Sequence, residues 1–276
     1  MPDKTPIEME AGMGRPAPLK PEEFQFIRYR AERAVARLTL NRPEHNLLNE
    51  RMLVELAAGI EMLGEHAEVK LIVLDSACKA FCGGIELGEY TPRRVFQVLD
   101  AFHQAFAAML ETGKPILAVV NGPAFGGGAE LAALADLVVA TPKARFAQPE
   151  IKLGVFPPLS AVIMPYVIGP KLALELVLTG ETMTAERARE LGLVNRLVPE
   201  VQLEKTVNEL IAQVTAQSGP VLTMAKKAIL GGMGMPLRAG VRNSMNIFLH
   251  ELCRLEDSQE GLRALIEKRA PHWKNK

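Results

Sequence analysis

The chain has 276 residues, 48% of them hydrophobic, and its 32 basic side chains balance its 32 acidic ones. This length suffices for one large buried core, while a net charge of zero provides no general attraction for nucleic acid or an anionic membrane surface. We therefore expect neither of these as a partner.

Cysteine and histidine usage argues against a metal or redox centre. The three cysteines (Cys78, Cys82 and Cys253) and five scattered histidines form no recognisable ligand pattern, so we expect reduced thiols and no bound metal. No stretch reaches the roughly 18 apolar residues that span a bilayer. The first residues lack the apolar segment of a secretory signal, and the expected location is the cytoplasm.

The chain divides into three parts by pattern. Residues 1–21 are rich in proline, glycine and charge, which predicts a loose arm. Residues 22–200 alternate short apolar runs with helical patterns, which predicts a parallel α/β core. Residues 201–276 show helical periodicity only, as in a lid or an oligomerisation region.

The individual elements follow from periodicity and from turn residues. Strands are predicted at residues 24–29, 35–40, 71–75, 116–120 and 137–140. A helix is expected after Asn49 as N-cap, with Met52, Leu53, Leu56 and Ile60 on its apolar face. Another is expected to open at Thr91-Pro92, with an apolar face formed by Phe96, Leu99, Phe102, His103 and Phe106. The C-terminal helices are predicted at 201–214, 221–230 and 237–269, the last broken near Ser258.

The strongest local signal is the segment NGPAFGGGAEL at residues 121–131, between a predicted strand and a predicted helix. Its consecutive glycines, which include Gly126 and Gly127, let a ligand approach bare backbone, and the first N–H groups of the helix suit a phosphate or an oxyanion. The glycines are not spaced as GxGxxG, so dinucleotide binding is weakly supported. A tight strand-to-helix turn with close packing explains the same pattern equally well.

Glu130 lies three residues beyond Gly127, which on a helix places its carboxylate on the same face. It is either a proton carrier beside an anion site or a first-turn glutamate that stabilises the helix dipole. Glu150, in the segment AQPEIKLG, follows a proline in an apolar loop. Burial there would raise its pKa and suit it to act as an acid, whereas a solvated loop carboxylate is the ordinary alternative.

A second glycine-rich loop, FCGGIEL at residues 81–87, follows the strand predicted at 71–75. Gly83 and Gly84 expose the backbone there, so that the Ile85 amide is a candidate second donor. Two N–H groups converging from separate loops are what an enolate-like oxygen requires, although an ordinary βα loop has the same composition. GxSxG, P-loop and HExxH motifs do not occur.

These three segments, in this order, resemble the crotonase (enoyl-CoA hydratase/isomerase) superfamily over residues 24–273. The resemblance also rests on Asn41-Arg42-Pro43, Lys114-Pro115, Leu178-Thr179-Gly180 and ARELGLV at 188–194. It implies an α/β spiral of ββα units followed by a helical trimerisation region, assembly as trimers or as hexamers that are dimers of trimers, and an acyl-CoA thioester substrate. No cofactor is implied, because coenzyme A is part of the substrate.

The family's site residues fall on specific positions of this chain. Its two oxyanion-hole amides fall on Ile85 and Gly127, and its two catalytic glutamates on Glu130 and Glu150. Retention of both glutamates is typical of the hydratases, so the resemblance implies reversible addition of water to an α,β-unsaturated acyl-CoA. Another acyl-CoA reaction on the same scaffold, an isomerase or a thioester hydrolase, stays open, as does a catalytically silent subunit that binds CoA or a partner protein.

Two departures from the family pattern concern the substrate. Gly88 stands where the family often has a lysine near the CoA phosphates, and Lys268, which matches a family position near the adenine, is an alternative contact. The glutamate segment continues as Val155-Phe156-Pro157-Pro158 rather than as a glycine-rich stretch. In this respect, and in the segment Glu89-Tyr90-Thr91-Pro92, the chain looks more like hydratases of cyclic dienoyl-CoA thioesters, with Phe156 and Pro157 against the acyl group.

Overall fold

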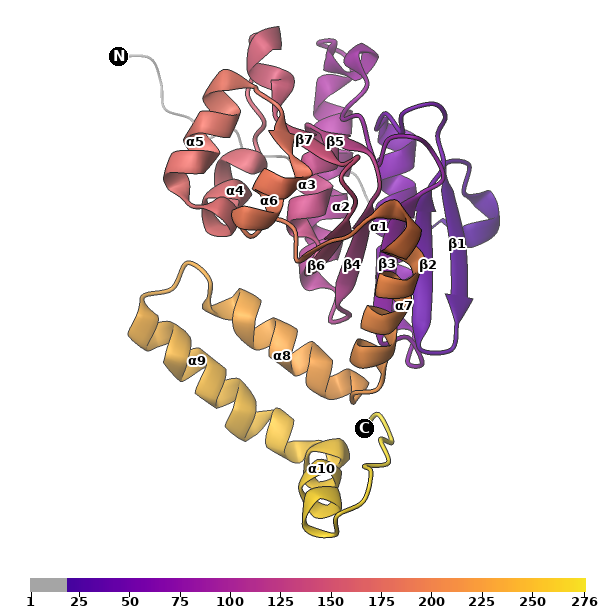
Figure 1. The fold of residues 1–276 in the computed structure, drawn as a ribbon, viewed down its shortest axis with the longest axis vertical. Helices are drawn as coiled ribbons and strands as arrows, with labels where there is room; N and C mark the ends of the chain where they lie inside the picture. The colour runs from indigo at the N-terminus through magenta and orange to yellow at the C-terminus, as the bar shows by residue number, and fades with distance from the viewer. Residues whose placement is uncertain (1–18) are drawn as a thin grey trace.

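The computed structural model describes residues 19–276, so the predicted arm lies outside the described residues except for its last three positions. Two sheets and a series of helices make up the described chain (Figure 1). The larger sheet has, in spatial order, β1 (Ile27–Glu32), β2 (Val35–Leu40), β3 (Leu71–Ser76), β4 (Ile116–Val120), β6 (Leu137–Ala140) and β9 (Arg196–Leu197). The smaller sheet consists of β5 (Pro123–Phe125), β7 (Arg145–Ala147) and β8 (Met183–Thr184).

The α-helices are α1 (Glu50–Glu65), α2 (Val95–Glu111), α3 (Gly127–Leu134), α4 (Ser160–Ile168), α5 (Pro170–Thr179), α6 (Ala185–Glu190), α7 (Glu200–Thr215), α8 (Gly219–Gly232), α9 (Leu237–His250) and α10 (Glu256–Ile266). Short 3-10 helices are η1 (Pro21–Glu23), η2 (Leu87–Tyr90), η3 (Pro149–Leu153) and η4 (Leu252–Arg254).

The central strands are buried on both faces. β1 and β2 are antiparallel, whereas β2, β3, β4, β6 and β9 run parallel. Alternate residues of β3 enter two separate cores: Ile72 and Leu74 pack with the main core, and Leu71 and Val73 pack on the face that α7 covers. Continuous apolar runs are therefore the correct pattern for these strands.

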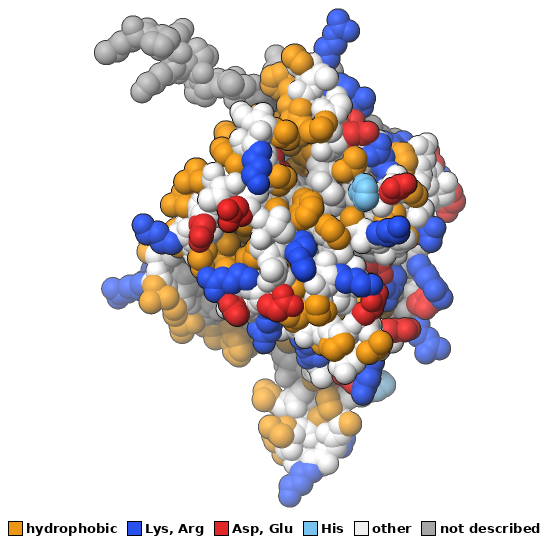
Figure 2. Space-filling view, turned by 45° about the horizontal axis from the view of Figure 1, so that its top comes forward, with side chains coloured by type: hydrophobic (Ala, Val, Ile, Leu, Met, Phe, Trp, Pro, Cys, Tyr) orange, Lys and Arg blue, Asp and Glu red, His pale blue; other side chains and the backbone are white. Residues whose placement is uncertain are grey.

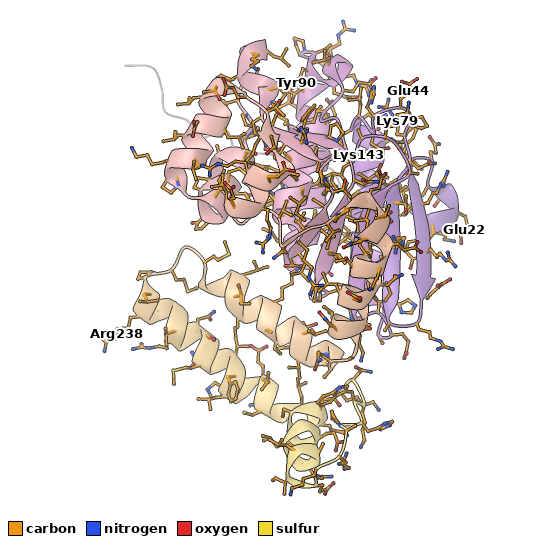
Figure 3. All side chains as sticks on the ribbon, in the orientation of Figure 1. Glu22, Glu44, Lys79, Tyr90, Lys143 and Arg238 are labelled. Atoms are coloured by element: carbon orange, nitrogen blue, oxygen red, sulfur yellow. The ribbon has the colours of Figure 1, made fainter. Side chains whose placement is uncertain are left out.

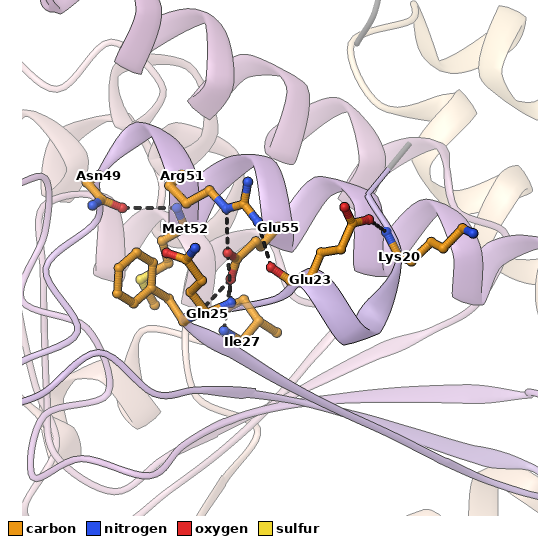
Figure 4. A network of polar contacts seen from close by, with 9 residues as sticks. Lys20, Glu23, Gln25, Ile27, Asn49, Arg51, Met52 and Glu55 are labelled. Atoms are coloured by element: carbon orange, nitrogen blue, oxygen red, sulfur yellow. Dashed lines mark hydrogen bonds and ion pairs between the residues drawn. The ribbon is translucent and has the colours of Figure 1, made fainter. Parts of the chain in front are cut away.

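A buried carboxylate joins α1 to the start of β1 (Figure 4). Glu55 accepts hydrogen bonds from the backbone N–H groups of Gln25, Phe26 and Ile27 at 2.8–3.1 Å and from Arg51 Nε at 2.7 Å. The helix itself begins as predicted, because the Asn49 side chain accepts from the Met52 N–H. Glu55 thus has a structural function, with both of its oxygens bonded.

Three sequence predictions are corrected here. The first strand runs from Ile27 to Glu32 rather than over residues 24–29, because the amides just before it are bonded to Glu55 and its pairing with β2 starts at Ile27. The second helix begins at Val95, and Pro92 lies in the turn before it, where the Thr91 carbonyl accepts from the Arg94 N–H. The C-terminal break lies at residues 251–255 rather than at Ser258.

The buried face of α2 also differs from the predicted one. Phe96 is 73% exposed and His103 is exposed. Phe102 is buried as predicted, and Leu99 and Phe106 are partly buried against the main core. The fully buried residues are Val98, Ala101, Phe102, Ala105, Ala108 and Met109, so the prediction is wrong for Phe96 and His103 alone.

The last three helices extend away from the sheets, below them in Figure 1. One buried lysine ties α8 to the core: Lys226 Nζ donates to Asp136 Oδ2 at 2.8 Å and to the carbonyls of Met109 and Lys114 at 3.2 Å. Beyond this anchor the helices expose many apolar side chains, and hydrophobic groups remain at the surface in Figure 2. Within residues 19–276, none of the helices has the length and apolar character needed to cross a bilayer.

Candidate active site

The first glycine-rich loop lies against the start of the smaller sheet. The Cys82 N–H donates to the Pro123 carbonyl, and the Phe125 N–H donates to the Cys82 carbonyl at 2.9 Å. Gly84 has a φ of +98°, and a Cβ there would lie 2.9 Å from the Phe125 carbonyl oxygen. Only glycine fits this position without strain. The turn leaves the Ile85 N–H without an acceptor among the residues that the structure describes.

The second glycine-rich loop leads from β5 into α3 and touches the first through bare backbone. A Cβ on Gly128 would lie 2.2 Å from the Cys82 carbonyl oxygen, and one on Gly127 would lie 3.6 Å from Ile85 Cγ1. Gly127 is the first residue of α3, and its N–H has no acceptor in the described chain. The predicted donors Ile85 and Gly127 are therefore neighbours at a helix N-terminus.

Glu130 is almost completely buried, at 2% exposure, one turn into α3. Its Oε1 accepts a hydrogen bond from the Ser160 N–H at 2.6 Å. The pKa of Glu130 is raised to about 7, chiefly by burial and also by the nearby Glu150, against hydrogen bonds from Ser160 and Leu159 that lower it. A carboxyl group with this pKa exchanges its proton readily near neutral pH.

Glu150 lies in η3 and is 7% exposed. A Cβ on Gly126, which has a φ of +51°, would lie 2.2 Å from Glu150 Oε1, so the glycine makes room for the carboxylate. Burial raises the pKa of Glu150. Its Oε2 is buried and has no hydrogen-bond partner in the described chain, unlike the fully bonded Glu55. A buried acceptor without a protein partner is free to bind a water or a ligand, and Asp75, Glu89 and Gln148 each have one such oxygen as well.

Tyr90, at the end of η2, belongs to the segment that resembles cyclic dienoyl-CoA hydratases, but the sequence assigned it no role in the site (Figure 3). Burial, together with the charges of Glu150 and Glu130, raises the pKa of its phenol to about 12. The phenol therefore lies within electrostatic reach of both carboxylates. Gln148 and Ser160 were also not predicted as site residues; both are fully buried, Ser160 is bonded to Glu130, and Gln148 is bonded to Ser160.

The remaining predicted contacts are more dispersed. Pro157 is buried, but Phe156 is 63% exposed in the single chain. Lys268 is exposed beyond α10, and Figure 1 shows α10 well apart from α3. Gly83 lies under the 42–47 segment, with its N–H bonded to the His45 carbonyl at 2.8 Å. One chain thus brings together Gly84, Ile85, Gly126, Gly127, Glu130 and Glu150, but not Lys268.

Two other features lie outside this cluster. A cavity of about 420 Å³ lies between the sheet and α7, lined by residues such as Arg37, Asp75 and Asn121, but by none of the predicted site residues. No group of three or more potential metal ligands occurs among residues 19–276. The paired amides and paired carboxylates are therefore the arrangement with a chemical rationale: the amides can stabilise charge on an oxygen while the carboxylates move protons.

Known proteins of one family resemble this chain over most of its length. A family model described as enoyl-CoA hydratase/isomerase matches residues 30–276. A probable mitochondrial enoyl-CoA hydratase of Dictyostelium discoideum is 35% identical over 248 residues, with 88% of each chain covered. The cyclohexa-1,5-dienecarbonyl-CoA hydratase of Thauera aromatica is 32% identical over 248 residues, with 88% of this chain and 94% of that protein covered.

The likeness extends to three dimensions. The enoyl-CoA hydratase structure from Mycobacterium smegmatis matches with a TM-score of 0.85 at 30% identity, covering 90% of this chain and 99% of that one. The α/β core followed by C-terminal helices is thus the crotonase fold predicted from the sequence motifs. On fold and sequence together, this chain belongs to the crotonase (enoyl-CoA hydratase/isomerase) superfamily.

Proposed function

We propose that this enzyme of the enoyl-CoA hydratase type adds water reversibly to an α,β-unsaturated acyl-CoA thioester. The observation that carries the proposal is the pair of buried glutamates with raised pKa values beside two free backbone amides. The amides of Ile85 and Gly127 would donate hydrogen bonds to the thioester oxygen and stabilise the enolate charge that develops on it when water attacks.

The two carboxylates have complementary parts in this proposal. Water adds through its oxygen to the β-carbon, Glu130 takes the proton that the water loses, and Glu150 supplies a proton to the α-carbon. The unpartnered Oε2 of Glu150 can accept a hydrogen bond from the same water. The product contains the elements of one water, the cycle closes when the proton gained by Glu130 is returned to Glu150 directly or by exchange with solvent, and no oxidant or reductant is required.

The reaction class is tested with three thioesters side by side: a 2-enoyl, a 3-enoyl and a saturated acyl-CoA. Hydration of the 2-enoyl substrate as the fastest reaction supports the proposal. Faster migration of the double bond in the 3-enoyl substrate would make the enzyme an isomerase, and release of free CoA from the saturated one would make it a hydrolase. Turnover of none of them would favour a silent CoA-binding subunit. The cytoplasmic location stays a prediction, and the Dictyostelium relative is named mitochondrial.

A planar ring is the acyl group that we expect the pocket to prefer. Two adjacent prolines, Pro157 and Pro158, fix φ and remove two N–H donors after the second glutamate, and a stiff wall suits one shape better than others. The Thauera aromatica relative is named for a cyclic dienoyl substrate. We expect kcat/KM for cyclohexa-1,5-diene-1-carbonyl-CoA to exceed that for crotonyl-CoA at least about tenfold, or about 1.4 kcal/mol.

Phe156→Gly should reduce this preference by affecting the ring substrate more, because it removes a flat apolar surface. Leu174→Ala on α5, also an exposed apolar side chain, is the matched control and should leave the ratio unchanged. Equal or reversed preference in the wild-type enzyme would contradict the cyclic assignment and favour a straight-chain substrate.

We propose that the chain assembles as a homotrimer, or as a hexamer made of two trimers, through the helices after α7. The apolar side chains exposed there are Ile229, Met233, Leu237, Val241, Met245, Phe248, Leu249, Leu262, Leu265 and Ile266. A cluster of this size is typical of an interface. Lys268, distant from its own site, would then meet CoA only at a partner's site.

Light scattering should give a mass of at least three times 30.1 kDa, and Val241→Glu should lower it by placing a charge in the apolar cluster. Lys205→Glu, on the exposed side of α7, should leave the mass unchanged. A point substitution is preferable to deletion of residues 201–276 as a test of assembly. Val207 and Leu210 of α7 pack on the sheet, so the deletion would expose that core and destabilise the fold itself. A stable monomer at micromolar concentration would refute the assembly.

A further inference from the structure

Ser160 occupies a buried junction between three elements of the site. It is the first residue of α4, and its side chain is 0% exposed. Glu130 reaches it from α3, and Gln148 reaches it from the residue before η3. Gln148 is also 0% exposed, so water does not compete with these contacts from bulk solvent.

Two hydrogen bonds define the orientation of Ser160. Its backbone N–H donates to Glu130 Oε1 at 2.6 Å, and its hydroxyl oxygen accepts from Gln148 Nε2. A serine hydroxyl carries one proton, whereas an ionised carboxylate can only accept. With Gln148 as donor to the hydroxyl, the single proton of Ser160 is not used in that contact, and Glu130, already held 2.6 Å from the Ser160 backbone nitrogen, is an acceptor beside it.

We propose that Ser160 is a positioning residue for the proton transfer, whose hydroxyl, oriented by Gln148, holds Glu130 in its ionised form inside the apolar site. This inference rests on the proposed role of Glu130 in hydration. The Ser160 hydroxyl is not a catalytic group, because it acts on the substrate only through the carboxylate.

The surroundings of Glu130 explain why such a donor matters. The titratable groups that act on it or feel its charge are Glu150 in η3, Tyr90 in η2 and Cys82 in the first glycine-rich loop. All three are acidic, and no cation contributes among the described residues. Burial and Glu150 both raise the pKa of Glu130, so hydrogen bonds from Ser160 and Leu159 are what keep it at about 7.

The direct test is an infrared titration of the protonated carboxyl band, assigned to Glu130 by its loss in Glu130→Gln. In Ser160→Ala the backbone N–H remains while the hydroxyl is removed. We expect the pKa of Glu130 to rise by about one unit. Gln148→Met, which removes the donor to Ser160, should shift it in the same direction by less, and it also serves as the second variant if Ser160→Ala fails to fold.

Kinetics give an independent readout. An ionised Glu130 is required as base, so kcat/KM should increase with pH through about 7 in the wild-type enzyme. Ser160→Ala should move this ascending limb to higher pH, so that kcat/KM falls about tenfold below the limb, while the descending limb set by loss of the Glu150 proton stays in place. A purely packing role would instead lower kcat/KM equally at every pH.

Ser218→Ala is the matched control, because Ser218 is also buried and donates to a carboxylate, Asp257 Oδ2, at 2.6 Å in the C-terminal region. It should leave both readouts unchanged. An unchanged or lowered Glu130 pKa in Ser160→Ala would overturn the inference. If no thioester is turned over by the wild-type chain, the proposed function fails, but the infrared titration still decides the role of Ser160.

Discussion

Replacing Glu130 or Glu150 with glutamine is expected to lower kcat for hydration by about 10²- to 10⁴-fold, which is the usual contribution of general acid–base catalysis. Glutamine keeps the size of the side chain but transfers no proton. Both residues are at least nine-tenths buried, so the amide also fills the same space. Steady-state kinetics with the preferred 2-enoyl-CoA provide the measurement, and circular dichroism checks that the fold is retained.

The two residues should also act as a unit. The double variant is expected to lose less than the product of the single losses, because both carboxylates serve one water molecule in the proposed reaction. Glu181→Gln, at an exposed position, should retain wild-type activity. Normal hydration by either single variant would show that its residue has no part in proton transfer.

Lys226→Met is expected to lower the free energy of unfolding by about 3–5 kcal/mol, the usual cost of breaking a buried ion pair from one side. The Lys226 and Asp136 side chains are 7% and 20% exposed. Methionine fills a similar volume but leaves the Asp136 carboxylate and the carbonyls of Met109 and Lys114 without their ammonium partner. Denaturant unfolding at one fixed protein concentration measures the change, since assembly would make stability depend on concentration.

The neighbouring Lys227 offers a close control on the same helix. It also forms an ion pair, with Glu251 at 2.5 Å, but the two side chains are 51% and 39% exposed. Lys227→Met should therefore cost under about 1 kcal/mol. If the two variants lower the free energy of unfolding equally, the buried Lys226–Asp136 pair stabilises the attachment of α8 no more than an exposed ion pair does.

The strands of the larger sheet were largely readable from the sequence because their signal is local. β2, β4 and β6 have the predicted bounds, since short apolar runs between turn residues leave few alternatives. β1 was misplaced because its boundary depends on Glu55, some thirty residues away in the chain. Which side of α2 is buried depends likewise on its contact with α1, an earlier element of the chain. This contact leaves Phe96 and His103 exposed.

For the site, the spacing of the glycines predicted the two loops but not the residues that surround the glutamates of the proposed reaction and shift their pKa values. A Cβ would collide with backbone at Gly84 and Gly128, and such positions leave a trace in composition. Ser160 and Tyr90 have ordinary neighbours in the sequence, and their relation to Glu130 exists only in three dimensions. The sequence also cannot tell a structural buried acid such as Glu55 from Glu150, because only hydrogen-bond partners separate them.

The position of β1 at the open edge of the larger sheet bears on how these molecules can associate. An edge strand exposes unpaired backbone groups that can template pairing with another chain, and natural proteins discourage this with charged side chains. The strand reads IRYRAE, with Arg28, Arg30 and Glu32 exposed along it. Adding a strand there would desolvate these charges, so growth of the sheet from molecule to molecule, the first step of fibrillar aggregation, is disfavoured at this edge.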